Sequence, residues 1–277
     1  MPGTGVTAAG VTAAGVTDGG VTAAGVTDGG LGVTAHGLGV RGPRGWAFRD
    51  VTFQAEPGSL IAVEGPSGSG RTCLLLTLAG RMKPTEGSAL VGEWRLPKQM
   101  AAVRQVSGLA HVAGVTDLDP ALTVGEHLGE RALLQRRFGD SLRGLLQPRG
   151  ERSLRARLRI DAALEAAGLD PGALPKGTRT AVRDLERLEA LRLSVALALI
   201  GRPGLLGVDD TDLKLSDAER AQVWALLRSV AEAGTTVVAV CSEAPGDAGG
   251  TVTVATGESA AARGKEEADA LAETGRA

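Results

Sequence analysis

The residues with the clearest chemical potential form a glycine-rich turn between an apolar run and a helix-like stretch. In order, the turn and the residue after it are Gly65, Pro66, Ser67, Gly68, Ser69, Gly70, Arg71, Thr72 and Cys73. The turn fits the phosphate-binding pattern G-x-x-x-x-G-K-[ST] except at the lysine position. Glycines in that pattern let the backbone curl so that N–H groups and a helix N-terminus face phosphates. We therefore expect these residues to bind the phosphates of a nucleotide.

Arg71 occupies the lysine position of this turn. Arginine keeps the positive charge, but its planar fork is larger than an ammonium group and reaches phosphate differently. The substitution should therefore affect catalysis more than binding. A chance turn is the alternative in a chain with 41 glycines, but the flanking strand and helix favour phosphate binding.

Two carboxylates follow an apolar run, residues 205–208, that predicts a buried strand. They belong to Asp209 and Asp210. In a P-loop fold such a strand lies beside the strand that feeds the phosphate turn, and its terminal aspartate reaches the Mg2+ that the threonine of the turn also holds. The sequence therefore predicts a Mg2+ site made by Thr72 and Asp209.

Size and charge limit the classes of function. The chain of 277 residues can form one large domain with flexible ends, and its net charge of −2 gives no reason to expect a nucleic-acid partner. Cys73 and Cys241 lie in apolar contexts without metal-ligand spacing, which favours buried, reduced thiols and a cytoplasmic protein. No apolar run approaches the roughly 18 residues that a membrane-spanning helix needs.

The composition divides the chain into three parts. Residues 1–38 begin with a GVTAA/GVTDG repeat that offers little side chain to bury, so we expect a disordered tail; a stacked β-solenoid is the alternative. Residues 39–255 have the texture of a folded domain, and residues 256–277 are charged and small, which predicts a flexible C-terminal tail.

Within the domain, strand-like and helix-like segments alternate. An alternating strand over 46–53 and the strand over 60–63 predict an antiparallel hairpin region ahead of the turn. A helical region opens near Pro120 and Thr123, and eight arginines between 136 and 159 predict either a solvated helix face or a docking surface. The pattern favours an α/β fold with a three-layer core, a mainly parallel sheet and a helical insert over about 117–190.

The order of these parts resembles the ATP-binding subunit of ABC transporters over roughly 39–255. The resemblance rests on the strand ending at Phe53, the phosphate turn, the LTVGEHL start of the insert and the run ALALIGRPGLLGVDD. It implies a P-loop NTPase fold that binds ATP and Mg2+. It also implies an insert that docks on an integral-membrane permease and a second ATP-binding subunit, of the same or another kind. Such a chain would be cytoplasmic and peripheral at the inner face of the cell membrane.

The chain departs from the family where hydrolysis is organised. The LSGGQ signature should fall at 185–189, where Glu186 and Glu189 stand instead of phosphate-binding residues. Asp210 replaces the catalytic glutamate, Ser242 replaces a histidine, and no glutamine stands near residue 114. Trp46 is the nearby aromatic that could stack on adenine.

These departures leave several functions open. The groups that bind phosphate and Mg2+ are mostly present, whereas those that position water are mostly replaced, so hydrolysis should be weak or lost. An ABC-type transport subunit is the first interpretation. A nucleotide-binding regulatory or structural module is the second, and a P-loop kinase or another NTPase is the third.

Overall fold

The computed structural model describes residues 29–43, 45–138, 149–212, 214–245 and 250–256. The pentapeptide repeats expected to be disordered, and nearly all of the expected C-terminal tail, lie outside these residues. So does Arg143, one of the eight arginines of the insert; on helix α5 the side chains of Arg155 and Arg157 are exposed.

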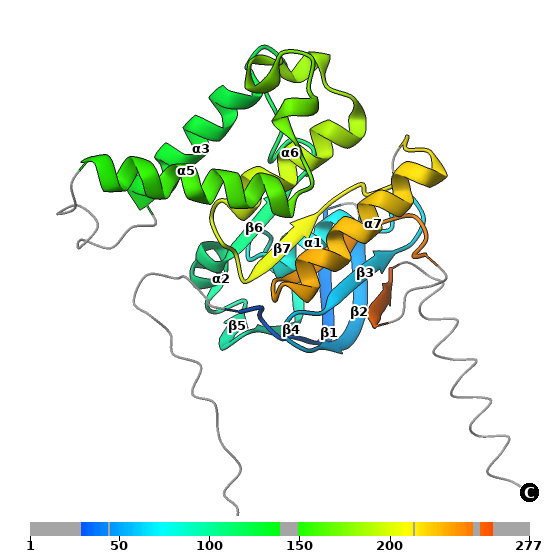
Figure 1. Cartoon of the computed structure of the whole chain (residues 1–277). Helices are drawn as coiled ribbons and strands as arrows, with labels where there is room; N and C mark the ends of the chain where they lie inside the picture. Colours follow the sequence, from blue (N-terminus) through cyan, green and yellow to red (C-terminus); the bar gives the residue numbers. More distant parts are fainter. Residues whose placement is uncertain (1–28, 44, 139–148, 213, 246–249, 257–277) are drawn as a thin grey trace, which may run out of the picture.

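The first strands form an antiparallel sheet at one side of the molecule (Figure 1). Its strands, in spatial order, are β2 (Gly45–Ala55), β1 (Val33–Gly42), β4 (Glu86–Val91) and β5 (Trp94–Leu96). Strand β1 is central, because it pairs antiparallel with both β2 and β4. The predicted antiparallel region is confirmed as a sheet, but the expected pairing of the strands over 46–53 and 60–63 is wrong. Strand β2 pairs with the preceding strand β1, and residues 60–63 belong to the other sheet.

The predicted start of the domain at residue 39 is too late. Strand β1 begins at Val33, and Leu31, Val33, Ala35 and Leu38 are buried in the core beneath this sheet. The sequence around them still resembles the repeat, but its apolar side chains alternate, as the buried face of a strand requires. The last residues of the expected tail are therefore part of the fold.

The second sheet is parallel throughout (Figure 1), and one of its inner strands leads into the phosphate turn. Its strands, in spatial order, are β6 (Ser107–Ala110), β7 (Leu205–Val208), β8 (Thr236–Val240), β3 (Leu60–Glu64) and β9 (Thr251–Ala255). Strands β6, β7 and β8 are buried along their whole length. Helices or a second sheet cover both faces of such a sheet, which explains its nearly continuous apolar sequence.

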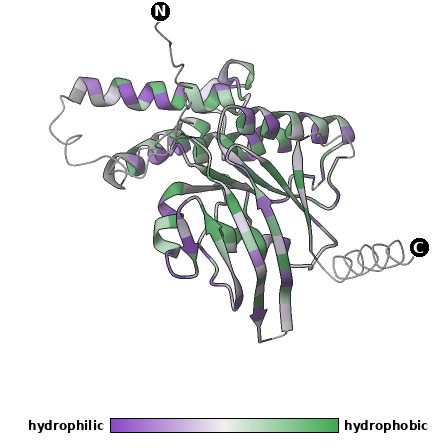
Figure 2. Ribbon diagram, turned by 90° about the horizontal axis from the view of Figure 1, so that it is seen from below, coloured by the Kyte–Doolittle hydropathy of each residue, from purple (hydrophilic) through white to green (hydrophobic). Residues whose placement is uncertain are grey.

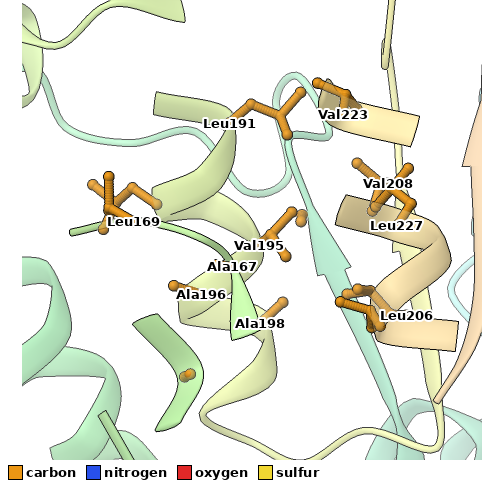
Figure 3. Close-up of a cluster of buried hydrophobic side chains, with 14 of the residues drawn as sticks. Ala167, Leu169, Leu191, Val195, Ala196, Ala198, Leu206, Val208, Val223 and Leu227 are labelled. Carbon is orange, nitrogen blue, oxygen red and sulfur yellow. The ribbon is translucent and has the colours of Figure 1, made fainter. Parts of the chain in front are cut away.

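Helices on either face of the parallel sheet form two apolar cores. On one face, α1 (Arg71–Leu78) and α2 (Met100–Val106) pack between the two sheets. On the other face, α6 (Arg187–Leu199) and α7 (Asp217–Glu232) pack against the sheet. Figure 3 shows Leu227 of α7 close to Leu206 and Val208 of β7. The layered α/β core predicted from the sequence is confirmed.

The described residues of the insert form α3 (Val124–Phe138), α5 (Arg149–Ala166) and three short 3-10 turns, Pro171–Ala173, Gly177–Arg179 and Val182–Asp184. Thr123 begins α3 as predicted, since its hydroxyl accepts from Glu126 N while the Glu126 carboxylate accepts from Thr123 N. Figure 2 shows hydrophilic and hydrophobic residues alternating along the helices of the molecule. The insert extends from the sheet on the side of β6 and α6 (Figure 1).

Candidate functional site

The glycine-rich turn joins β3 to α1 as the sequence predicts. Gly70 is the residue before α1 and has a left-handed φ of 86°, with no side chain capping the helix and no acidic residue in its first turn. Gly68 also has a positive φ, 83°, and an added Cβ there would meet nothing within 4 Å. Pro66, Ser67 and Gly68 are exposed at the crown of the turn. The first N–H groups of α1 are therefore free to face an anion.

Two glycines are required by close approach of the backbone. A Cβ on Gly70 would lie 2.0 Å from the carbonyl oxygen of Ala47 on β2, and one on Gly65 would lie 2.6 Å from the carbonyl oxygen of Thr256. Thr256 is buried, and its hydroxyl lies 2.7 Å from Ser69 Oγ. The expected end of the domain at 255 is thus one residue short, because Thr256 supports the turn.

The two residues predicted to share Mg2+ lie in direct contact. Thr72 Oγ1 donates to Asp209 Oδ2 over 2.8 Å, and Asp209 Oδ1 accepts from Asp210 N over 3.0 Å. The expectation that their strands lie side by side is wrong, because β8 lies between β3 and β7, but all three are parallel and their carboxyl ends reach the same edge of the sheet. Asp209 is 3% exposed, and burial raises the pKa of its carboxyl. The hydrogen bond from Thr72 and the positive charge of Arg71 oppose that rise in pKa.

Arg71 reaches across the edge of the sheet. Its Nη1 donates to the carbonyl oxygen of Cys241, the residue after β8. The guanidinium thus connects the start of α1 with the end of a neighbouring strand while its charge stays within range of Asp209. Cys241 itself is buried and reduced, and burial raises the pKa of its thiol to about 12.

Asp210 and Ser242 flank the same edge. Asp210 has a left-handed φ of 48°, an uncommon conformation for a residue other than glycine. The N–H of Ser242 donates to Asp212 Oδ2 over 2.6 Å, and its carbonyl accepts from Gly65 N over 3.4 Å. Hydrogen bonds therefore join the segments that follow β7 and β8 to each other, and join the segment after β8 to the phosphate turn.

His111 is a polar residue at this edge that the sequence reasoning did not single out. It follows the last residue of β6, whose carbonyl accepts from Asp209 N over 3.3 Å. His111 has a φ of 55° and is exposed, and its N–H donates to Ser194 Oγ over 2.7 Å. The sequence did contain a signal for His111, because it is the first polar side chain after the apolar run of β6. The sequence reasoning passed over it because it looked for a glutamine near Gly114.

Trp46 lies on β2, next to the residue that approaches the phosphate turn. Its ring is flanked by two guanidinium groups, with the Cζ of Arg41 5.6 Å and that of Arg49 5.1 Å from the ring centroid. Both distances suit cation–π contact. A base stacking on this ring would therefore meet positive charge as well as an aromatic face.

The segment in place of the LSGGQ signature caps its own helix. Glu186 precedes α6, and its side chain accepts from the backbone of Glu189. In return Glu189 Oε2 accepts from Glu186 N over 2.9 Å. These carboxylates occupy N–H groups at the α6 N-terminus, and their negative charge disfavours a phosphate there.

The donors at the edge of the parallel sheet fit Mg-ATP. A helix N-terminus without a side-chain cap suits phosphate, and one carboxylate beside one hydroxyl is a donor set that Mg2+ commonly uses together with phosphate oxygens and water. Among the described residues no cluster of three or more His, Cys, Asp or Glu forms a separate metal site.

Comparison with known proteins decides the family. Residues 48–212 match the family described as ABC transporter. The chain belongs to the ABC transporter family. Within it, the chain is 32% identical over 193 residues to the cytochrome c biogenesis ATP-binding export protein CcmA of Pseudomonas putida, covering 69% of this chain and 80% of CcmA. The resemblance to an ABC nucleotide-binding domain is thereby confirmed.

Other ABC relatives are longer than the matched part. A probable anion import ATP-binding protein of Haloferax volcanii is 29% identical over 208 residues, which cover 73% of this chain and 67% of the relative. The Nod factor export ATP-binding protein I of Cupriavidus metallidurans is 30% identical over 189 residues, covering 68% of this chain and 55% of the relative. The chain thus spans between about half and four fifths of these relatives.

Solved structures agree on the fold. MJ0796, described as a bacterial ABC transporter cassette in a dimeric structure, superposes with a TM-score of 0.60 at 20% identity, covering 80% of this chain and 94% of that chain. CbiO1 of Clostridium perfringens, part of the cbiONQ complex, gives a TM-score of 0.60 at 19% identity, covering 76% and 78%. Within the described part of this chain, no helix combines the length and apolar character needed to span a bilayer.

Proposed function

We propose that this ABC chain is the ATP-binding subunit of a transport system and binds Mg-ATP at the turn formed by residues 65–72. The supporting observation is the contact between Thr72 Oγ1 and Asp209 Oδ2 at the base of an uncapped helix N-terminus. When bound, Mg2+ supplies positive charge that neutralises phosphate oxygens. Thr72 and Asp209 would hold the ion, Arg71 would face the phosphates, and Trp46 would stack on adenine.

In this proposal hydrolysis by the chain alone is weak or lost. Arg71 is bound to the Cys241 carbonyl, Asp210 is one methylene shorter than a glutamate, and Ser242 carries no imidazole. The self-capped end of α6 offers little to a phosphate held by another subunit. Each missing transition-state group costs about a hundredfold or more, although such losses need not add.

The proposed assembly contains a membrane permease and a second ATP-binding subunit, identical or different. The relative CcmA is named as an export protein, and MJ0796 was solved as a dimer, which supports both kinds of partner. The chain would then lie in the cytoplasm, held at the inner face of the cell membrane by the permease.

Thermal unfolding with and without nucleotide tests the proposal. A ligand that binds the native state alone stabilises it by about 2.7 kcal/mol at a hundred times its Kd, so Mg-ATP should raise the Tm clearly. Thr72→Ala should remove most of the Mg2+-dependent part, and Thr253→Ala, at an exposed position on β9, is the matched control. An unchanged Tm at millimolar Mg-ATP would refute the proposal.

A regulatory module that binds ATP without turnover is the second candidate. The self-capped α6 N-terminus favours it, because carboxylates fill the place of phosphate-binding residues. Steady-state phosphate release by the chain assembled with its permease and second ATP-binding subunit decides between the two: turnover that depends on Asp209 supports a transport ATPase, and its absence beside normal Mg-ATP binding supports the module.

A further inference from the structure

A groove runs between α5, a helix of the insert, and the C-terminal end of α7. It consists of two neighbouring cavities of about 300 and 270 Å3, which share Ala162 and Ala166 of α5 and Ala233 after α7. These three alanines are exposed, whereas Ala163 and Ile200 are buried in the wall of the larger cavity. The small side chains leave an apolar groove with room for a few small residues.

The first described residue of the chain, Gly29, lines the larger cavity. The path of the chain is fixed there by Gly30, where an added Cβ would lie 2.6 Å from the carbonyl oxygen of Gly234. It is fixed also by Leu31, whose N–H donates to the carbonyl oxygen of Gly204 over 3.1 Å. The N-terminal repeat therefore joins the fold at the groove.

The residues just before Gly29 match the groove in size. Residues 24–28 read AGVTD, and the repeat from residue 5 onwards contains only glycine, valine, threonine, alanine and aspartate. An extended chain covers about 3.3–3.6 Å per residue, so five residues span roughly 17 Å. The stretch of α5 from 162 to 166 rises only about 6 Å. Residues 24–28 are therefore long enough to pass along the groove.

Charge also matches at the larger cavity. Arg202 lines it and is exposed, and within the described part of the chain its guanidinium makes no hydrogen bond or ion pair. Arg159 adds a second positive charge to the same wall. Glu165, the one carboxylate among the residues that line the groove, belongs to the smaller cavity. Asp28 directly precedes Gly29, so its carboxylate enters the fold beside the positive charge.

We propose that residues 24–28 of this chain bind in the groove, with the Asp28 carboxylate paired to the Arg202 guanidinium and Val26 packed against the alanines. Because the segment is attached to the wall of the groove, its local concentration is in the millimolar range, and weak contacts suffice. Helix α5 belongs to the insert and α7 to the core, so the bound segment contacts both. Nucleotide takes no part in this contact, which goes beyond the proposed function.

Disulfide trapping in the full chain tests the location of the segment. Val26→Cys is combined with Ala166→Cys in the groove or, as the control, with Glu56→Cys. Glu56 is exposed and lies two residues before Gly58, whose N–H lies beside Gly30 on the path of the chain. A disulfide needs Cα atoms within about 7 Å, so its rate of formation reports how often the two positions meet.

In a glutathione buffer, the disulfide between positions 26 and 166 should form at least about tenfold faster than the one between 26 and 56. Non-reducing gels and peptide mapping identify the linked positions and separate them from Cys73 and Cys241. Equal rates for the two pairs would overturn the proposal. Linkage mainly between two copies of the chain would also overturn it, because the occupant would then be a second molecule.

A reversal of charge tests the ion pair. Arg202→Asp should slow the disulfide between 26 and 166 severalfold, and Asp28→Arg in the same chain should restore it, because the reversed pair has the same combined length. Arg202 has a left-handed φ of 48°, which aspartate tolerates, so the substitution suits the backbone. Asp18→Arg, in an earlier repeat unit, is the matched control and should not restore the rate. Failure of Asp28→Arg to restore it, or equal rescue by Asp18→Arg, contradicts the pairing.

Discussion

Asp209 illustrates, at the scale of single residues, how a binding group destabilises the fold that holds it. Its carboxylate is buried at the end of β7, and burial raises its pKa above the ordinary value. For an acid whose pKa is higher in the folded state, stability falls as pH rises from the unfolded pKa to the folded pKa. Above that window the buried charge is a constant cost to the protein without Mg2+.

We predict that Asp209→Asn raises the Tm of the nucleotide-free protein at pH 7 and abolishes the Mg2+-dependent part of the ATP shift. The amide oxygen can still accept from Thr72 or Asp210 N, but it carries no charge to desolvate or to attract Mg2+. The gain in Tm should shrink as pH falls through the pKa window. A lower Tm at pH 7 would show that the carboxylate stabilises the apo fold instead.

Gly70 and Gly129 should respond in opposite ways to the same substitution. Gly70→Ala places a Cβ 2.0 Å from the Ala47 carbonyl at a left-handed φ, and strain of this kind costs about 1–3 kcal/mol before the clash is counted. Gly129 lies within α3, and an added Cβ meets nothing within 4 Å, so Gly129→Ala should stabilise by about 0.5–1 kcal/mol. Urea unfolding of the two variants measures both effects.

At the scale of elements, strand β1 decides where the folded chain begins. It lies between β2 and β4, and side chains of Leu31, Val33, Ala35 and Leu38 are buried beneath the sheet. Each such valine or leucine contributes about 1.5–3 kcal/mol on burial, so their sum is comparable to the stability of a typical domain. The start of the fold is therefore set by these side chains and by β1 pairing.

Two truncations test this boundary. Removal of residues 1–28 should change the Tm by no more than about 2 °C, because the repeat supplies few side chains that a core could bury. Removal of residues 1–38 should give protein that is insoluble or unfolded by circular dichroism, since the central strand loses its first half. If the protein that lacks residues 1–38 had the same Tm as the full chain, the role given to β1 would be contradicted.

Local patterns made most elements predictable, and long-range contacts limited the rest. Thr123, the phosphate turn and the apolar run before Asp209 are signals contained in a few neighbouring residues. By contrast, the membership of residues 33–38 in a sheet depends on β4, some 50 residues away, and the role of Thr256 depends on Ser69. The contact of Arg71 with the Cys241 carbonyl also joins distant segments, so no local pattern could indicate it.

At the scale of the whole molecule, the layered core brings the groups of the phosphate site together from distant parts of the chain. The phosphate turn, Asp209, Asp210 and the end of β8 meet at one edge of the parallel sheet. Helix α6, whose N-terminus is capped by Glu186 and Glu189, follows the insert. The loss of a catalytic group from any of these parts can limit ATP hydrolysis even when ATP binds well.

Substitution of Arg71, the residue at the lysine position, tests how far the other missing catalytic groups limit hydrolysis. In a P-loop, a lysine stabilises the charge that builds on the β- and γ-phosphates, so a site that lacked nothing else should gain turnover from Arg71→Lys. Here the side chain of Asp210 is one methylene shorter than that of a glutamate, and Ser242 has no imidazole. Glu186 and Glu189 cap α6. A lysine at position 71 would therefore enter a site that cannot position water. We predict that Arg71→Lys changes ATP affinity by a small factor and leaves phosphate release well below about 1 per second.

Arg71→Ala completes the comparison, because it separates charge from geometry. Loss of a charge-assisted contact costs about 1.5–3 kcal/mol, so ATP affinity should fall roughly tenfold or more, whereas the lysine variant keeps the charge. The alanine variant also loses the bond to the Cys241 carbonyl, and its nucleotide-free Tm should fall below that of the unaltered chain. Phosphate release at saturating ATP, measured on the three proteins without any other subunit, decides the outcome. A rate near 1 per second in the unaltered chain, or a rise to that level with lysine, would establish an ATPase whose remaining groups suffice for catalysis.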